Sequence, residues 1–210
     1  MSQGRTNYDA KLQRILRTAA RVFAEKGYHQ ASIRDISRAA GVSLAGLYYY
    51  FQSKEELLFL IQDHALGSLI AGVEDRLPTS GDPLEKLRIL IDNQLRFFVD
   101  NMSEMKVLSH EAGSLTGEFR ANVEAQKRRL TRLAKQILRE VDPRSELDER
   151  VSAFALFGMM NWLYVWYRPG RDADVDRLVH DMTTIFMRGF VGRREVRESR
   201  VPRALVGRSG

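Results

Sequence analysis

Three consecutive tyrosines, Tyr48 to Tyr50, stand just before Lys54 in the sequence. A tyrosine hydroxyl can donate a hydrogen bond to a phosphate oxygen, and it carries no charge that must be stripped of water. The lysine offers an ammonium group to the same kind of anion. Successive helix positions are about 100° apart, so three tyrosines in a row cannot all face one core. These residue types indicate a surface that binds the phosphate backbone of a nucleic acid.

The positive charge of the chain is concentrated at its two ends. Residues 1–54 hold nine Lys or Arg against three Asp or Glu, and residues 193–210 hold six Arg against two Glu, so the segment between them is mildly acidic. A basic head on an acidic body favours a polyanion as the partner of the head, although a solvated basic face would give the same balance. Residues 193–210 have few large apolar side chains, and we expect them to form a disordered basic tail.

Residue types that usually catalyse reactions or bind metals are scarce or scattered. The chain has no cysteine, which excludes a thiol nucleophile and a thiolate metal site and suits a reducing cytoplasm. A metal site could arise only if folding happened to gather His64, His110, Glu111 and His180. There is no glycine-rich phosphate loop and no Gly-x-Ser-x-Gly elbow. We therefore predict no enzyme activity, no cofactor and no metal site, in a cytoplasmic protein without a signal peptide.

The elements that must position the tyrosines are predicted to be helices. Apolar residues recur at helical spacing from Leu12 to Phe23, and Gly27 is placed to end that helix. Ser32 begins a second helix with a capping box, and Ser43 can cap a third helix from Leu44 to Phe51. The aromatic run alone would favour a strand, but no second strand pattern exists to pair with it.

The rest of the chain is also predicted to be helical. Turn-rich breaks follow Leu77 and recur at residues 142–143 and 169–170. The expected helices start at Ser53 and then cover residues 83–98, 103–114, 118–140, 147–168 and 175–190. Residues 151–167 carry no charge, which touches the lower limit for a membrane span. No second such segment exists, so we expect burial against a partner subunit and no membrane insertion.

The second and third helices, joined by "AAGVS", form a helix-turn-helix pattern. In such a unit the second helix enters the major groove of DNA. Leu47 and Phe51 are four positions apart and should pack inward. Tyr48 and Tyr50 would then hold the DNA backbone, while Tyr49 would reach further into the groove.

The stretch "AARVFAEKGYHQASIRDISRAAGVSLAGLYYYFQSKEELL" resembles the DNA-binding domain of the TetR family of bacterial transcriptional regulators. The resemblance covers residues 8–58, about a quarter of the chain. It implies an all-α fold with an N-terminal three-helix helix-turn-helix domain over residues 1–53. It also implies a C-terminal helical domain over residues 54–192 that forms a homodimer and binds a small effector.

The resemblance further implies which side chains meet double-stranded operator DNA. Residues that match the family's phosphate contacts are Ser32, Tyr48, Tyr50 and Lys54. Residues that match its base-proximal positions are Leu44, Ala45, Gly46 and Tyr49, and we add Ser43 and Arg34 to this DNA-binding set. Many relatives carry longer polar residues at positions 44 and 46. We therefore expect this chain to recognise its DNA sequence mainly through contacts with thymine methyl groups and through DNA shape.

The later helices supply candidates for an apolar effector pocket. Methionine and aromatic side chains give an adaptable cavity, although plain core packing is the alternative for each of them. The candidates are Phe97, Phe98, Met102, Met105, Met159, Trp162 and Trp166. The segment "NWLYVWYRPG" (161–170) resembles a stretch of TetR-type regulators that respond to acyl-CoA thioesters or to related fatty or steroid acids. A basic helix could meet the CoA phosphates through Arg120, Lys127, Arg128, Arg129 and Arg132.

These observations predict a ligand-responsive repressor that binds a palindromic operator as a dimer and is released by an apolar effector, with an acyl-CoA thioester as the first candidate. The helices at 147–168 and 175–190 are the most apolar and are expected to form the dimer interface. Two alternatives stay open: a multidrug-sensing repressor of an efflux pump, and an architectural DNA-binding protein without an effector.

Overall fold

The computed structural model describes residues 2–111 and 113–190, and this part of the chain is helical with no strand. The all-α fold predicted from the sequence is therefore confirmed. The predicted basic tail at 193–210 lies outside the described residues.

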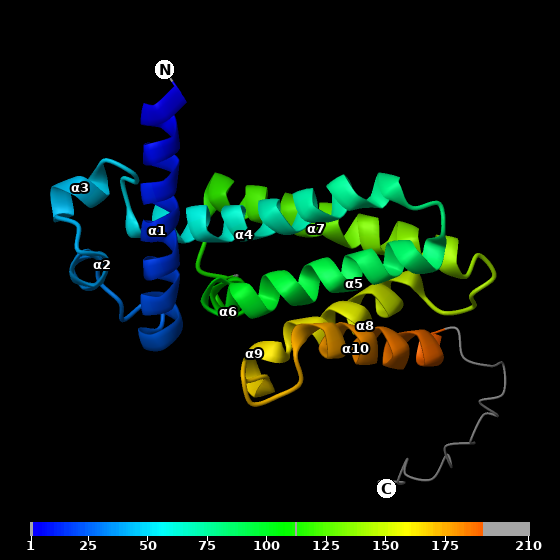
Figure 1. Ribbon diagram of the computed structural model, residues 1–210. Helices are drawn as coiled ribbons and strands as arrows, with labels where there is room; N and C mark the ends of the chain where they lie inside the picture. Colours follow the sequence, from blue (N-terminus) through cyan, green and yellow to red (C-terminus); the bar gives the residue numbers. More distant parts are fainter. Residues whose placement is uncertain (1, 112, 191–210) are drawn as a thin grey trace, which may run out of the picture.

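The first three helices form a small unit of their own: α1 (Ser2–Lys26), α2 (Ile33–Ala40) and α3 (Leu44–Tyr48). Helix α1 ends where Gly27 takes a left-handed backbone conformation, with φ of 81°. The capping box predicted at the start of α2 is present: the Asp35 amide donates to Ser32 Oγ, and the Ser32 amide donates to the Asp35 carboxylate. Figure 1 shows α2 and α3 lying to one side of the upright α1.

Helix α3 is shorter than the sequence predicts, because it ends at Tyr48 and not at Phe51. Tyr49 and Tyr50 form a turn, in which the Tyr50 amide donates to the Leu47 carbonyl at 2.9 Å. Aromatic residues are weak helix formers, so a run of three gives the helix little reason to continue. The turn brings Phe51 into the core, where it is 1% exposed beside the fully buried Leu47. The prediction that these two residues pack inward is confirmed.

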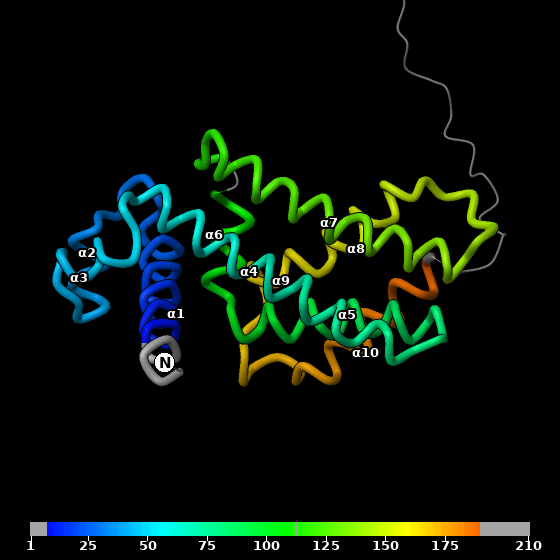
Figure 2. The backbone as a smooth tube through the Cα atoms, turned by 90° about the horizontal axis from the view of Figure 1, so that it is seen from above, coloured from blue at the N-terminus to red at the C-terminus, as the bar shows by residue number. Residues whose placement is uncertain are grey.

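The remaining helices form an elongated body that lies across α1 (Figure 1). They are α4 (Lys54–Arg76), the 3-10 turn η1 (Leu77–Thr79), α5 (Pro83–Asp100), α6 (Met102–His110), α7 (Gly117–Val141), α8 (Glu149–Asn161), α9 (Leu163–Trp166) and α10 (Val175–Phe190). Seen from above, α4 leads from the small unit into this body (Figure 2). Side-chain caps again fix helix starts: the Glu56 amide donates to Ser53 Oγ at 3.0 Å, and the Leu84 amide donates to Asp82 Oδ1 at 3.1 Å.

The prediction of a single helix at 147–168 is wrong, because the chain breaks at Trp162 into α8 and α9. Two contacts across the body account for the break. Asn161 Oδ1 accepts a hydrogen bond from Gln94 of α5 at 3.1 Å, which holds the end of α8. Beyond the break, the Tyr164 ring stacks on Phe98 of α5, with ring centroids 6.4 Å apart. The uncharged stretch 151–167 is thus divided between two helices.

Within the described residues, the stretch Lys54–Thr79 is long and apolar enough to cross a membrane by length and composition. Half of its most apolar window is buried inside the protein. Its apolar side chains, such as Leu58, Leu69 and Val73, belong to the common core. This helix therefore has the character of a core helix.

Candidate DNA-binding surface and effector cavity

The recognition segment presents the side chains that helical spacing places outward. Tyr49 is 73% exposed, and Tyr48, Leu44 and Ala45 are exposed as well. Tyr50 is half-buried, and Arg34 is exposed on α2. These residues form the outer side of the helix-turn-helix, as the sequence pattern predicts.

Tyr8 of α1 joins this surface, although no motif in the sequence indicates it. Its ring centroid lies 4.9 Å from that of Tyr50 and 5.9 Å from that of Tyr49. The rings of Tyr49 and Tyr50 also meet edge to face at 5.3 Å. The contact joins residues 41 and 42 positions apart in the chain, so no local spacing could have indicated it. Tyr8 therefore helps to set the direction of the two tyrosines.

The two serines of the predicted DNA-binding set act as helix caps. Ser43 Oγ accepts a hydrogen bond from the Gly46 amide at 3.1 Å, and Ser32 Oγ donates to Asp35 at 2.6 Å. A Cβ atom at Gly46 would lie 3.0 Å from a Val42 methyl group and 3.1 Å from Ser43 Oγ, so a larger residue has little room. The hydrogen bond from Ser32 and the ammonium of Lys26 hold the pKa of Asp35 well below its usual range.

Lys54 is tied to the protein backbone. Its ammonium donates to the carbonyl oxygens of Tyr28 at 2.8 Å, Ala31 at 2.9 Å and His29 at 3.3 Å. It also lies 4.5 Å from the centre of the Tyr28 ring. Three backbone acceptors thus compete with any phosphate for the three ammonium protons. A phosphate contact by Lys54 stays a prediction.

The same region connects the helix-turn-helix to the body through the end of α6. Glu111 accepts from the Tyr28 amide at 3.2 Å and from the Ser114 hydroxyl at 2.8 Å, and its carbonyl accepts from Gln62 of α4 at 3.2 Å. One turn earlier on α6, Lys106 donates to the Ala24 carbonyl of α1 at 2.8 Å. Helix α6 is therefore bonded to the DNA-binding unit and to α4 at once.

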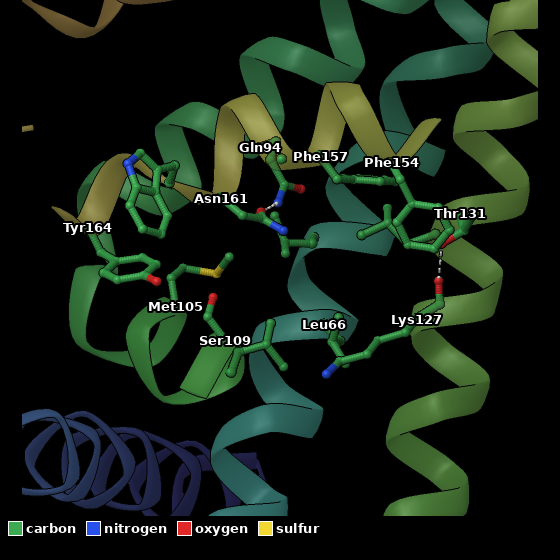
Figure 3. A pocket seen from close by; sticks show the side chains of 15 residues that line it. Leu66, Gln94, Met105, Ser109, Lys127, Thr131, Phe154, Phe157, Asn161 and Tyr164 are labelled. Atoms are coloured by element: carbon green, nitrogen blue, oxygen red, sulfur yellow. Dashed lines mark hydrogen bonds between the residues drawn. The ribbon is translucent and has the colours of Figure 1, made fainter. Parts of the chain in front are cut away.

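A cavity of about 440 Å³ lies in the body, between α4, α5, α6, α7, α8 and the start of α9 (Figure 3). Its volume falls within the range typical of small-molecule sites. Its wall is mainly apolar and is formed by Leu66, Leu69, Gln94, Met105, Leu108, Ser109, Lys127, Leu130, Thr131, Phe154, Phe157, Gly158, Asn161, Trp162 and Tyr164.

Two polar side chains give the cavity its chemical character. Gln94 is 2% exposed, and its Oε1 has no hydrogen-bond partner although its nitrogen donates to Asn161. Lys127 of α7 is half-buried, and burial lowers the pKa of its ammonium while Glu124 opposes that shift. The wall is therefore mainly apolar, with the cation of Lys127 and the polar side chains of Ser109 and Thr131 in it, and it is suited to a mainly apolar ligand that carries a polar end.

The seven predicted ligand-binding residues are divided by the structure. Met105 and Trp162 line the cavity, whereas the other five are not among its lining residues. Phe98 is fully buried behind Tyr164, and Trp166 is exposed with its ring against Tyr167. Phe97, Met102 and Met159 pack partly buried against the core.

The basic side chains of α7 differ in whether they are paired with a carboxylate and in whether they line the cavity. Arg129 forms a two-pronged pair with Glu74 of α4, at 2.6 and 2.9 Å. Arg120 and Arg128 both reach Glu124, at 2.8 and 3.7 Å, and Arg132 is exposed. Lys127 is the cation of this helix that lines the cavity. Within the described residues, no group of three or more His, Asp or Glu side chains could hold a metal ion.

Helices α8 and α10 pack together along the lower edge of the body and leave apolar side chains in solvent (Figure 1). Val151 of α8 is 67% exposed, and Ile185 of α10 is 63% exposed. On α8 the exposed positions continue through Ala155 and Gly158 to Trp162, which is one helical stripe with small residues in its middle. Such a stripe is typical of a face that packs against another helix.

Comparison with known proteins assigns both parts of the chain. Residues 15–61 match the family model described as "Bacterial regulatory proteins, tetR family", and residues 80–190 match the model "Tetracyclin repressor-like, C-terminal domain". The HTH-type transcriptional repressor KstR2 of Mycobacterium tuberculosis is 26% identical over 182 residues, which cover 84% of this chain and 90% of that protein. The fatty acid metabolism regulator protein of Bacillus subtilis is 24% identical over 185 residues, or 86% and 95% of the two chains.

Solved structures agree with this assignment. The TetR family transcriptional regulator PfmR of Thermus thermophilus is 32% identical, with a TM-score of 0.76 over 83% of this chain and 97% of that one. AibR, solved in complex with isovaleryl coenzyme A and operator DNA, is 28% identical, with a TM-score of 0.74 over the same shares. These relatives are transcriptional regulators and not enzymes. Because the family models cover the helix-turn-helix and more than half of the chain, this protein belongs to the TetR family of bacterial transcriptional regulators.

Proposed function

We propose that the protein is a cytoplasmic, dimeric repressor whose grip on a palindromic operator is released by an acyl-CoA thioester. The observation that carries the effector proposal is the cavity with Lys127 in its apolar wall. A half-buried ammonium favours a ligand with anionic or carbonyl oxygens near that end. The relatives that regulate fatty acid metabolism and that bind isovaleryl coenzyme A support the same class of ligand.

The cavity can enclose only the acyl end of such a ligand. Its volume of about 440 Å³ corresponds to about 15 non-hydrogen atoms, at the roughly 30 Å³ that a water molecule occupies in the liquid. A dozen carbons with the thioester group fill that space. The nucleotide part would then lie outside, where Arg128 and Arg132 of α7 are exposed.

DNA binding is proposed to use the outer side of the helix-turn-helix. Tyr48 and Tyr50 would hold phosphates, and Leu44, Ala45, Gly46 and Tyr49 would lie nearest the bases. Ser32 and Ser43 cap two helices, and the free amides at these helix starts would also face the DNA backbone. Dimerisation through α8 and α10 would place two such units on half-sites about 34–36 Å apart.

Release requires that the ligand prefer a conformer whose two DNA-binding units are wrongly spaced for the operator. Helix α6 supplies the connection, since Met105 and Ser109 line the cavity while Lys106 and Glu111 bond to the DNA-binding unit. A coupling free energy of about 1–3 kcal/mol would weaken operator binding roughly 5- to 150-fold.

An operator-binding assay with long-chain, steroid-derived and aromatic CoA thioesters tests this proposal, together with quenching of tryptophan fluorescence, since Trp162 lines the cavity. We expect at least one thioester class to quench the fluorescence and release the DNA. Lys127→Met should weaken that thioester, whereas Lys11→Met, on the exposed side of α1, should not. If a cationic drug quenches the fluorescence and releases the DNA while no thioester does so, the protein is a multidrug sensor. The ammonium of Lys127 makes binding of a cationic drug electrostatically unfavourable.

A further inference from the structure

The N-terminal half of α1 carries an aromatic side chain to the outer side of the helix-turn-helix. Tyr8 lies four residues before Leu12, which packs against the core, and seven before the fully buried Ile15. This helical spacing places Tyr8 at the end of the core-facing stripe of α1, where its side chain is 36% exposed. Figure 1 shows α3 beside this half of α1. The Tyr8 ring is therefore carried by a helix whose position the core fixes.

Tyr49 depends on neighbouring rings for its direction. It follows the last residue of α3, and it is the most exposed of the three consecutive tyrosines. Its ring plane is turned by 74° from that of Tyr8 and by 87° from that of Tyr50. The rings of Tyr8 and Tyr50 lie closer together, at 4.9 Å, and their planes are tilted by 31°. Tyr8 and Tyr50 thus form a support against which the Tyr49 ring stands nearly perpendicular.

This support bears on how Tyr49 binds DNA. A side chain that is mostly in solvent samples several rotamers, and ordering it during association weakens the complex. Edge-to-face aromatic contacts are favourable beyond the area that they bury, so they hold such a ring before any partner arrives. The two ring contacts therefore preorganise Tyr49 in the free protein.

We infer that Tyr8 is a positioning residue for operator recognition: its ring holds Tyr49 in the direction from which Tyr49 reads the DNA, and Tyr8 acts without touching a base. The inference rests on the proposed place of Tyr49 near the bases. The effect passes through Tyr49 and involves no phosphate contact by Tyr8. Tyr8 should therefore influence the discrimination between DNA sequences and leave the salt-dependent attraction to the DNA backbone unchanged.

The test uses the full-length protein, a DNA duplex that the wild type selects from a random pool, and a scrambled duplex of the same composition. Dissociation constants are measured by fluorescence anisotropy over a salt series. Tyr8→Ala should weaken binding to the selected duplex about 5- to 30-fold, because an aromatic contact is lost at each of two half-sites. Binding to the scrambled duplex should change less than about threefold, with the same salt slope. Tyr8→Phe keeps the ring and should bind both duplexes as the wild type does.

Tyr48 provides a matched control in a double-mutant cycle. Its ring lies 6.3 Å from that of Phe51, and within the described residues no ring contact joins it to Tyr8. Tyr8→Ala should therefore cost as much affinity in a Tyr48→Ala background as in the wild type. In a Tyr49→Ala background it should cost less than about threefold, because the side chain through which Tyr8 acts is gone.

The Tyr8 variants should fold, because Tyr8 lies outside the buried core and alanine is the best helix former, and their Tm should stay within about 3 °C of the wild type. An equal loss of affinity on both duplexes would overturn the inference, since Tyr8 would then serve general attachment to DNA. A Tyr8→Phe variant as weak as Tyr8→Ala would also overturn it, because the hydroxyl would then contact the DNA directly.

The proposed place of Tyr49 is tested separately. If Tyr49→Ala weakens binding to the selected duplex but Tyr8→Ala does not, Tyr49 reads the DNA without support and only the role of Tyr8 is refuted. If Tyr49→Ala binds the selected duplex as tightly as the wild type, the place of Tyr49 near the bases is wrong, and the role of Tyr8 is refuted with it.

Discussion

Lys54→Met removes an ammonium that the protein binds with three of its own carbonyl groups, and it keeps most of the apolar stem. A hydrogen bond from a charged donor contributes about 1.5–3 kcal/mol when it is well made and buried. Two of these bonds are short, at 2.8 and 2.9 Å, but Lys54 is partly exposed, so solvent screening reduces each of them. A total loss of about 2–3 kcal/mol is reasonable, and for a chain of this size it lowers the Tm by roughly 5–10 °C.

The assay combines thermal unfolding with operator binding over a salt series. A lost phosphate contact would reduce the slope of log K against log salt by about 0.9, whereas a lost internal tie would leave the slope unchanged. We expect Lys54→Met to lower the Tm and to keep the slope. Arg34→Ala is the matched control, because Arg34 is exposed on α2, and it should lower the slope and keep the Tm. A Lys54 variant with an unchanged Tm and a smaller slope would refute the structural role and restore the phosphate contact.

Three further predictions concern assembly, pH dependence and backbone strain. Val151→Glu or Ile185→Glu should yield monomers in sedimentation at micromolar concentration with nearly unchanged Tm, because both side chains are exposed in the proposed interface; a dimer that persists in both variants would place the interface elsewhere. Burial raises the pKa of Glu104, so the charge of this side chain destabilises the fold above the unfolded value of 4.5. Glu104→Gln should therefore raise the Tm by a few degrees at pH 7, and this gain in Tm should vanish as the pH falls to 4.5. A gain in Tm that stays constant with pH would contradict this reasoning. Gly27→Ala should cost about 1 kcal/mol in thermal or urea unfolding, because φ is 81° there, whereas Gly81→Ala, at a position without positive φ, should cost little.

Helix starts could be predicted from the sequence, but the ends of α3, α6 and α8 could not, and α6 ends at His110 where the sequence predicts residue 114. Ser32 and Ser53 mark the starts of their helices because a cap depends on residues only three positions away. The ends of α3 and α8 depend on distant partners. Phe51 must reach the core of the small unit, and Asn161 is held by Gln94, which is 67 positions earlier. Hydrophobic periodicity carries no information about such contacts.

The same division holds for the candidate sites. The outward position of Tyr49 follows from helical spacing around Leu47, and the structure agrees. The internal bonds of Lys54 and the ring contacts of Tyr8 join residues that are far apart in the chain, so neither was visible in the sequence. For the cavity, aromatic and methionine content indicated a pocket in the right domain. It could not indicate the hydrogen bond from Gln94 to Asn161, which exists only because of how α5 and α8 meet.

The length of α4 sets the scale of motion that would be needed to leave the operator. Leu66, where α4 touches the cavity, is 12 residues beyond Lys54, so about 18 Å of helix extend from the cavity wall to the DNA-binding unit at 1.5 Å per residue. A tilt of about 5° at Leu66 would move Lys54 by roughly 1.6 Å, and opposite tilts in two subunits would change the separation of the half-site readers by about 3 Å, close to the 3.4 Å rise of one base pair. An error of one base pair in register would therefore require no unfolding and no large rearrangement. A ligand that adds a few atoms beside Leu66 would be large enough to cause it.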